Sequence, residues 1–299
     1  MGMSMTDNKL GKPAPAPIPA VTILVPAYNE ENGIGPVLDE LKKLNLPGEI
    51  LVIDDGSTDK TFERAQATGV QVIRHDINRG YGQALKSGIL AARNDIIVIT
   101  DADGTYPNEE LENLLSYIST HDMVVGARTG SQVKIPIIRQ PAKKFLNILA
   151  NYLAGTRIPD LNSGMRAFRK DVALKFFNIL PSGFSFTTTI TLAMLSNGYR
   201  VKYFPINYHQ REGKSKIHPI RDTIGFTLLI VRTTLYFNPL KVFMPMSGMV
   251  FLAAMVLLVS SKYLLGRVMD ISVIVLLSAS LQIAVIGMLA DLIDKRGQR

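Results

Sequence analysis

The sequence predicts an α/β fold with a mainly parallel sheet, followed by two membrane-spanning helices. Five short runs rich in Val and Ile alternate with helical patterns over about residues 20–210, which is typical of βαβ units. Acidic residues follow several of these runs, and open α/β sheets bind ligands at the carboxyl ends of their strands. Two long, uncharged, largely apolar stretches follow from residue 242 onward.

Each element of the α/β region has its own local signal. The expected strands are 21–26, 49–54, 70–74, 95–100 and 123–126, each ending near Pro, Gly or an acidic residue. Apolar residues from Ile34 to Leu44 keep a helical period, with Asn32 available as a cap. Asp59 is placed to cap a further helix that runs through Ala67.

Composition divides the chain further. Residues 1–20 carry a Pro/Ala run without apolar periodicity and are expected to be a disordered leader. Segments 135–153 and 217–237 mix apolar residues with Lys and Arg, which suits interfacial amphipathic helices, although helices packed on the sheet are the alternative. We therefore expect a catalytic domain over 21–212, a basic loop and interfacial helix over 213–241, a transmembrane hairpin over 242–290 and a cytoplasmic tail over 291–299.

The hairpin prediction depends on length. Stretches 242–261 and 271–290 can each cross a bilayer, which takes about 20 helical residues. Two buried helices of a soluble domain are the alternative, but they need a protein shell that no sequence after Ala290 supplies. Because no signal peptide is evident, we expect the large domain in the cytoplasm. Ser278, Ser280 and Gly287 permit close helix approach, so a homo-oligomer is allowed.

Charge and cysteine content exclude several function classes. The net charge of +8 suits nucleic acid, anionic lipid or phosphorylated ligands, and the membrane segments favour the last two. No nucleic-acid-binding motif is present, so no nucleic-acid partner is expected. Without cysteine, the chain has no thiol nucleophile and no disulfide framework.

Acidic motifs carry the expected chemistry. Asp101 and Asp103 in TDADGTYP lie one residue apart, which suits a hard divalent cation that also holds diphosphate oxygens. In PAYNE, Tyr28 can stack on a base and Glu30 can accept from a ribose hydroxyl, although this motif alone is a weak signal. Asp54 in IDDGSTD can accept from a base N–H or a sugar hydroxyl. Together they favour a nucleoside-diphosphate substrate.

Six motifs occur in the order seen in family 2 glycosyltransferases of the Rossmann-like, nucleotide-sugar-binding GT-A fold. They are PAYNE, IDDGSTD, NRGYGQALKSG, TDADGTYP, VGAR and LNSGMRAFRK. With the basic REGKSK segment and the hairpin, residues 21–290 resemble the polyprenyl-phosphate branch, the dolichol-phosphate mannose or glucose synthases and their bacterial relatives. The resemblance implies an inverting transfer of a hexose from a nucleotide-diphosphate sugar to polyprenyl or dolichyl phosphate, with Mg²⁺ or Mn²⁺ as cofactor.

The resemblance also assigns roles to residues of this chain. Asp101 and Asp103 match the metal-binding motif, with Asp103 the more direct ligand, while Thr105 stands where the family often carries Gln. Arg128 matches the arginine after the fifth strand and belongs to the expected catalytic set with Asp103 and Asp160. The nucleotide-sugar-binding set is Pro26, Ala27, Tyr28, Glu30, Asp54, Asp101, Ala102, Arg211 and Lys216.

The acceptor side is less defined. Asp160, just before LNSGMR, is expected to act as a base or orienting group, with a structural turn role as the alternative. Arg139, Ser163 and Arg166 are expected to face the lipid phosphate, and solvated surface charges are the alternative for the two arginines.

Two other functions fit the sequence less well. A processive polysaccharide synthase is disfavoured because the chain has no tryptophan and so lacks a Gln-x-x-Arg-Trp motif. A non-catalytic membrane scaffold is disfavoured by intact Asp101 and Asp103. UDP-glucose is favoured over GDP-mannose because TDADGTYP differs from the DADxQ pattern common among mannose synthases.

Overall fold

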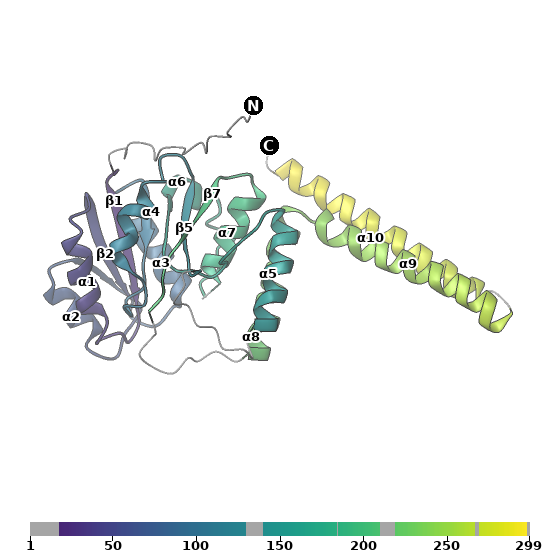
Figure 1. Ribbon diagram of the computed structural model, residues 1–299, viewed down its shortest axis with the longest axis horizontal. Helices are drawn as coiled ribbons and strands as arrows, with labels where there is room; N and C mark the ends of the chain where they lie inside the picture. The colour runs from purple at the N-terminus through teal and green to yellow at the C-terminus, as the bar shows by residue number, and fades with distance from the viewer. Residues whose placement is uncertain (1–17, 130–139, 184, 210–218, 267–268, 298–299) are drawn as a thin grey trace, which may run out of the picture. The chain divides into compact units, whose positions relative to one another are not determined.

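The computed structural model describes residues 18–129, 140–183, 185–209, 219–266 and 269–297 (Figure 1). Residues divide into two compact units. The α/β unit comprises Met1–Gln132, Ser163–Lys175 and Lys202–Glu212, and the helical unit comprises Val133–Asn162, Phe176–Val201 and Gly213–Arg299.

The α/β unit is built on a seven-stranded sheet in the order β3-β2-β1-β4-β6-β5-β7. Strands β1 to β4 run parallel where they pair, and β6 is antiparallel to both β4 and β5. The strands are β1 (Val21–Ala27), β2 (Gly48–Asp54), β3 (Gln71–Arg74), β4 (Ile96–Ile99), β5 (Met123–Ala127), β6 (Arg166–Arg169) and β7 (Val201–Pro205).

Helices cover this sheet and bury its apolar faces. The helices of the α/β unit are α1 (Ile34–Lys43), α2 (Thr61–Ala67), α3 (Tyr81–Ala91), the 3₁₀ turn η1 (Asn108–Glu110), α4 (Leu111–Leu115) and α6 (Lys170–Lys175). Ile34, Leu38 and Leu41 recur at helical spacing along α1 and are fully buried against the strands. The predicted helical period is therefore confirmed.

The start of α1 differs from the prediction. Gly33, and not Asn32, occupies the cap position, and no side chain caps the helix there. A Cβ atom on Gly33 would lie 2.4 Å from the carbonyl oxygen of Ala102. The missing side chain lets the chain between PAYNE and α1 approach the Asp101–Asp103 turn closely.

All five predicted strands are present, but two further strands were not predicted. Strand β6 begins and ends with arginine, so its sequence does not form the apolar run that indicates a buried strand. Strand β7 consists of half-buried and exposed residues and lies at the edge of the sheet. Strands β1 to β4 are parallel as predicted, whereas β6 pairs antiparallel with β4 and β5, so the sheet is mixed.

The helical unit contains α5 (Gln140–Ala154), α7 (Phe186–Ser196), α8 (Pro219–Phe237), α9 (Leu240–Leu265) and α10 (Asp270–Gly297). Helix α8 packs against both α5 and α7, and it keeps Leu228 and Tyr236 exposed on one side. Helices α5 and α8 match the predicted amphipathic segments 135–153 and 217–237. Residues 135–139 and 217–218 of these segments lie outside the described residues.

One polar contact connects α9 to α5. The ammonium group of Lys241, in the first turn of α9, donates to the carbonyl oxygen of Leu153 at 2.8 Å. Gly155 follows with φ of +72°, and a Cβ atom there would lie 3.1 Å from Lys241 Nζ. Glycine at this position thus permits both the left-handed turn and the approach of the lysine.

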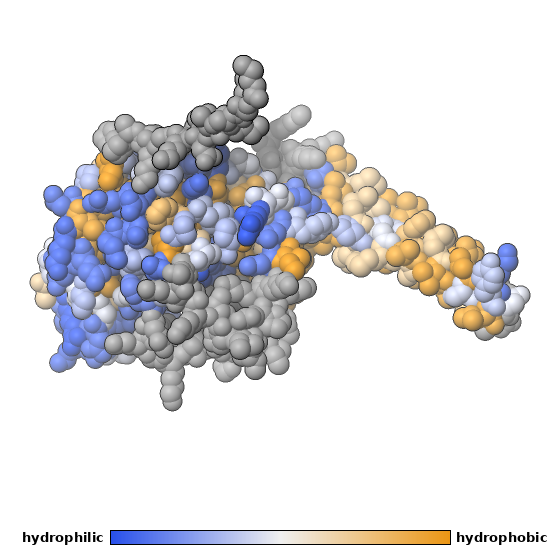
Figure 2. Space-filling model, in the orientation of Figure 1, coloured by the Kyte–Doolittle hydropathy of each residue, from blue (hydrophilic) through white to orange (hydrophobic). Residues whose placement is uncertain are grey.

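Helices α9 and α10 pack against each other as an antiparallel hairpin, and both are long and apolar enough to cross a membrane (Figure 1). Only 11% and 17% of their apolar windows are buried, whereas the core helix of a soluble protein is mostly buried. Figure 2 shows hydrophobic residues over the visible face of the hairpin. The exposure argues against the soluble-core alternative.

Small residues close this hairpin internally. Ser247 Oγ donates to the carbonyl oxygen of Ser280 at 2.8 Å, and Ser280 Oγ donates to that of Ser247 at 3.0 Å. A Cβ atom on Gly287 would lie 2.5 Å from Cβ of Phe243. Ser280 and Gly287 therefore pack α10 against α9 within one chain, and a homo-oligomer stays a prediction. Ser278 is exposed.

Candidate active site

The loops that follow β1 and β2 form one side of the candidate site. The backbone N–H of Asn29 donates to Ser57 Oγ at 2.9 Å, and that of Glu30 donates to Thr61 Oγ1 at 2.8 Å. These bonds join the PAYNE and IDDGSTD motifs, as expected for the carboxyl ends of neighbouring parallel strands. Pro26 and Ala27 are buried in β1, whereas the Tyr28 ring is 43% exposed and Glu30 is half-buried.

Asp54 ends β2 and is fully buried. Its Oδ1 accepts from the N–H of Ser57 at 3.2 Å, and its Oδ2 lies 3.2 Å from Arg74 Nε. Arg74 also donates to the Ser57 carbonyl oxygen at 3.2 Å and stacks over the Phe62 ring at 4.6 Å. Yet Asp54 Oδ2 accepts no hydrogen bond from any residue that the structure describes.

Asp55, the next residue, has an internal role. Its carboxylate accepts from the N–H groups of Arg79 at 3.0 Å and Gly80 at 2.8 Å. The same carboxylate pairs with His75 Nδ1 at 2.7 Å, and His75 Nε2 lies 2.9 Å from Ser87 Oγ on α3. Asp55 therefore fastens the NRGYG loop to the end of β2.

Asp101 and Asp103 follow β4 on a tight turn with Ala102 buried between them. Both aspartates are half-buried. The buried Thr105 donates to Asp103 Oδ1 through its hydroxyl at 2.6 Å and through its N–H at 3.1 Å. Thr105 thus orients the carboxylate of Asp103, a predicted metal ligand.

The donor set of this turn fits Mg²⁺ or Mn²⁺. Two carboxylates supply hard oxygens one residue apart, and magnesium sites often use one or two carboxylates with substrate phosphates and water. Within the described part of the chain, no three acidic or histidine side chains group closely enough to hold a metal ion by themselves. A metal at Asp101 and Asp103 would therefore need diphosphate oxygens to complete its coordination.

Two tyrosines and a glycine surround Asp101. Tyr81 Oη donates to Asp101 Oδ1 at 3.1 Å, and a Cβ atom on Gly164 would lie 3.0 Å from Asp101 Oδ2. Tyr106 Oη accepts from the N–H of Gly164 at 2.6 Å. Removal from water, and second the negative charge of Asp101, raise the pKa of Tyr81 and of Tyr106 above the ordinary value. Both hydroxyls therefore remain protonated.

The remaining residues of the α/β unit lie on or near β5 and β6. Arg128 is half-buried, with its guanidinium 5.3 Å from the centre of the Tyr208 ring. Ser163 is buried and donates to the carbonyl oxygen of Gly126 at 2.5 Å. Arg166 is also fully buried and donates to the carbonyl oxygen of Ser163, so the alternative of a solvated surface charge is wrong for this arginine. Contact with a lipid phosphate stays a prediction for Ser163 and Arg166.

Asp160 belongs to the helical unit, where it is buried and accepts from the N–H of Asn162 at 3.2 Å. This bond fits a turn role, and action as a base stays a prediction. Arg139, Arg211 and Lys216 lie outside the described residues.

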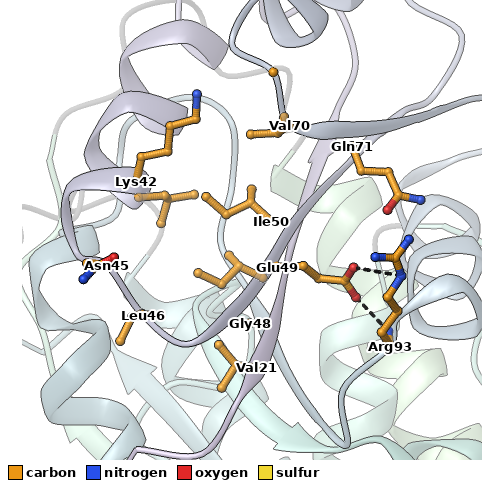
Figure 3. Close-up of a pocket in the computed structure, with 13 residues that line it drawn as sticks. Val21, Lys42, Asn45, Leu46, Gly48, Glu49, Ile50, Val70, Gln71 and Arg93 are labelled. Carbon is orange, nitrogen blue, oxygen red and sulfur yellow. Dashed lines mark hydrogen bonds and ion pairs between the residues drawn. The ribbon is translucent and has the colours of Figure 1, made fainter.

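A pocket of about 370 Å³ lies at the other end of the sheet, where β1 and β2 begin with Val21 and Gly48 (Figure 3). Its Glu49 carboxylate accepts from the N–H of Arg93 at 2.7 Å and pairs with Arg93 Nε at 3.6 Å. None of the predicted site residues lines this pocket, so it is separate from the candidate active site.

Sequence reasoning missed four residues of the site. Arg74, Tyr81 and Gly164 contact predicted residues, although each is distant in sequence from its partner. Tyr106 in turn binds the N–H of Gly164. The only sequence signal was their presence inside or beside the recognised motifs.

Two family models match consecutive parts of the chain. Glycosyl transferase family 2 matches residues 22–177, which is just over half of the chain, and the GtrB C-terminal hairpin matches residues 238–295. A dolichyl-phosphate hexose transferase of Haloferax volcanii is 32% identical over 217 residues, covering 72% of this chain and 94% of that protein. A polyprenol monophosphomannose synthase of Mycolicibacterium smegmatis is 29% identical, and the match covers 67% of this chain and 82% of that protein.

Solved structures show the same fold. Glucosyl-3-phosphoglycerate synthase from Mycobacterium tuberculosis, crystallised with Mn²⁺, UDP and phosphoglyceric acid, superposes with a TM-score of 0.57 at 22% identity. The match covers 73% of this chain and 78% of that one, and it confirms the GT-A fold. The family match, the six ordered motifs and the C-terminal hairpin agree, so this chain belongs to glycosyl transferase family 2.

Proposed function

We propose that this chain transfers a hexose from a nucleoside-diphosphate sugar to the phosphate of a polyprenyl or dolichyl phosphate. The observation that carries this proposal is the Asp101–Asp103 turn beside the PAYNE loop in a family 2 domain that precedes a membrane hairpin. The names of the relatives, a dolichyl-phosphate hexose transferase and a polyprenol monophosphomannose synthase, support a lipid phosphate as acceptor. We favour UDP-glucose as donor over GDP-mannose.

The reaction forms one bond and breaks another at the anomeric carbon. An oxygen of the lipid phosphate attacks this carbon while its bond to the diphosphate oxygen breaks on the opposite face, which inverts the configuration. Because the lipid phosphate is already ionised near neutral pH, it does not need a strong base. Positioning and charge compensation therefore carry most of the catalysis, and Asp160 would orient the acceptor or serve as a weak base.

Residues of the α/β unit would hold the donor. Asp101 and Asp103 would bind Mg²⁺ or Mn²⁺, and the bound ion would offset the charge of the leaving diphosphate. Thr105 keeps the Asp103 carboxylate in one orientation through two hydrogen bonds. Arg128, Arg211 and Lys216 would add positive charge near the diphosphate, while Tyr28 and Asp54 would contact the nucleoside.

The hairpin would anchor this reaction to the membrane, with the catalytic domain in the cytoplasm. Two helices by themselves cannot surround a polar path through lipid, although an oligomer of the chain is the alternative. The product would therefore remain in the leaflet where it forms.

Purified full-length protein, incubated with polyprenyl phosphate and a panel of sugar nucleotides, tests the proposal. We expect a glycolipid product that requires Mg²⁺ or Mn²⁺, is abolished by a chelator and is greatest with UDP-glucose. Asp103→Ala should lose transfer, whereas Asp39→Ala, at an exposed acid on α1, should keep it. Full activity of Asp103→Ala in chelator would refute the metal-dependent mechanism, and a sugar polymer in place of glycolipid would indicate a polysaccharide synthase.

A further inference from the structure

We propose that Tyr81 is a positioning residue for the metal ligand Asp101. This inference rests on the proposed function. Tyr81 is the first residue of α3, and its hydroxyl donates to Asp101 Oδ1 at 3.1 Å. The two residues lie 20 positions apart in the sequence, so the bond joins the NRGYG loop directly to the Asp-x-Asp turn.

The loop that presents Tyr81 is itself fixed to the sheet. Asp55 Oδ2 accepts from the N–H of Gly80 at 2.8 Å, and Asp55 Oδ1 accepts from the N–H of Arg79 at 3.0 Å. Gly80 has φ of +96°, a conformation that favours glycine, so the chain can turn sharply into α3 at this point. His75 braces the same carboxylate at 2.7 Å. Tyr81 therefore has a defined position before any ligand binds.

The opposite side of the Asp101 carboxylate is confined by backbone. A Cβ atom on Gly164 would lie 3.0 Å from Asp101 Oδ2 and 3.1 Å from Oδ1, so the carboxylate packs where a side chain would otherwise stand. The N–H of Gly164 is bound to Tyr106 Oη at 2.6 Å, which fixes this segment. Asp101 is thus held between the Tyr81 hydroxyl and the Gly164 backbone.

This arrangement determines what Tyr81 does for a bound metal. A hydrogen bond to one carboxylate oxygen fixes the plane of the carboxylate, so the other lone pairs keep one direction toward a cation. Removal of such a partner typically lowers metal affinity or activity by about 10-fold to 100-fold. Tyr81 need not touch the sugar, the diphosphate or the metal for this effect.

The test uses Tyr81→Phe in the full-length protein, with Mn²⁺ binding in the presence of UDP measured by electron paramagnetic resonance. We expect the Kd for Mn²⁺ to rise about 10-fold or more, with little change in thermal stability. Excess Mn²⁺ should restore much of the transfer rate, which it would not do for a folding defect. Tyr117→Phe is the matched control, because the Tyr117 ring packs on Phe204, with 6.1 Å between the ring centres. This variant should leave metal binding unchanged.

A second variant approaches Asp101 from the other side. Gly164→Ala should also weaken Mn²⁺ binding, because its methyl group would displace the carboxylate that Tyr81 orients. Wild-type Mn²⁺ affinity in Tyr81→Phe would overturn the role of Tyr81 and leave the proposed function intact, provided that Asp103→Ala still abolishes binding. Absence of Mn²⁺ binding in the wild type would overturn the metal-dependent function, and with it this inference.

Discussion

Asp54 and Arg74 form a pair in which one carboxylate oxygen still lacks a hydrogen bond from the described residues. The two atoms Asp54 Oδ2 and Arg74 Nε lie 3.2 Å apart, and Arg74 is itself held by the Phe62 ring and the Ser57 carbonyl. A buried acceptor without a hydrogen bond costs free energy, which a ligand N–H can recover. Uracil offers an N–H between two carbonyl groups. The Asp54 carboxylate can accept from this N–H, and the Arg74 guanidinium can donate to a neighbouring carbonyl.

Asp54→Asn and Arg74→Met should therefore weaken UDP binding by about 10-fold, the typical value of a hydrogen bond to a charged group. Both variants should also reduce the preference for UDP over CDP, because cytosine lacks the N–H and has an amino group in place of one carbonyl. Titration calorimetry would measure both nucleotides. Arg93→Met, at the opposite end of the sheet, is the control. An equal loss of affinity for pyrophosphate with Mn²⁺ would contradict a base-specific role.

Thr105→Val tests the orientation of Asp103. The valine keeps the volume but removes a hydroxyl that donates to Asp103 Oδ1 at 2.6 Å. We expect transfer to fall about 10-fold, as for other residues that orient metal ligands, and Thr105→Ser to restore most of it. Initial rates over a range of Mn²⁺ concentrations would measure this. An undiminished rate in Thr105→Val would show that Asp103 keeps its geometry without the threonine.

A site residue could be predicted from the sequence only where it lies near the end of a predicted strand. The positions of Asp101, Asp103 and Asp54 were predictable because each lies at or shortly after the carboxyl end of a strand, where parallel sheets bind ligands. Their roles stay predictions. Tyr81 and Gly164 act on Asp101 through contacts that only the folded sheet creates. No local pattern indicated them.

Among the elements, the loops after β1 and β2 depend on Asp59. Its carboxylate accepts from the N–H of Glu31 at 3.2 Å and from that of Thr61 at 3.0 Å, so it joins both loops at the start of α2. Lys60, and not Asp59 as predicted, occupies the cap position of α2, and the Asp59 carboxylate accepts from the N–H of Thr61, the first residue of this helix. Burial would raise the pKa of Asp59, but hydrogen bonds from Thr61 and Glu31 outweigh it and lower the pKa below its ordinary value of 3.8.

Asp59→Ala should reduce the free energy of unfolding by about 1 kcal/mol at pH 7, as for other lost caps. Because the folded-state pKa is lowered, the wild type should have this advantage above about pH 4 and lose it as the pH falls through the folded pKa. Thermal unfolding from pH 7 to pH 3 would measure the difference, with the exposed Asp39→Ala as control. A difference that is constant across this range would contradict an ionised cap.

Strand prediction succeeded where burial produces apolar runs and failed where it does not. Strand β4 reads Ile-Ile-Val-Ile and is fully buried, so its sequence indicates its place. Strand β6 carries the buried Arg166 at a position opposite Ile99 of β4, and its charge hides the strand from hydropathy. Its antiparallel direction follows from chain topology, which no local pattern encodes.

For the molecule as a whole, the hairpin contacts predict which helices meet. The chain has no cysteine, and Ser247 Oγ lies 3.1 Å from Ser280 Oγ. The double variant Ser247→Cys, Ser280→Cys should therefore form a disulfide within one chain under mild oxidation, seen by mass spectrometry of proteolytic fragments. Ser247→Cys with the exposed Ser278→Cys is the matched control and should not crosslink within the chain. Disulfide-linked dimers of the first pair would show that these serines face a second copy.

Through the bond between Lys241 and the Leu153 carbonyl, we expect helix α5 to respond to bilayer thickness. A spanning helix that is longer or shorter than the surrounding hydrocarbon adapts by tilting or by deforming the lipid. Because Lys241 lies in the first turn of α9 and donates to a carbonyl in the last turn of α5, we expect a tilt of the hairpin to displace the end of α5. The lipid chain length of the host membrane would then act on the helical unit without any ligand or modification.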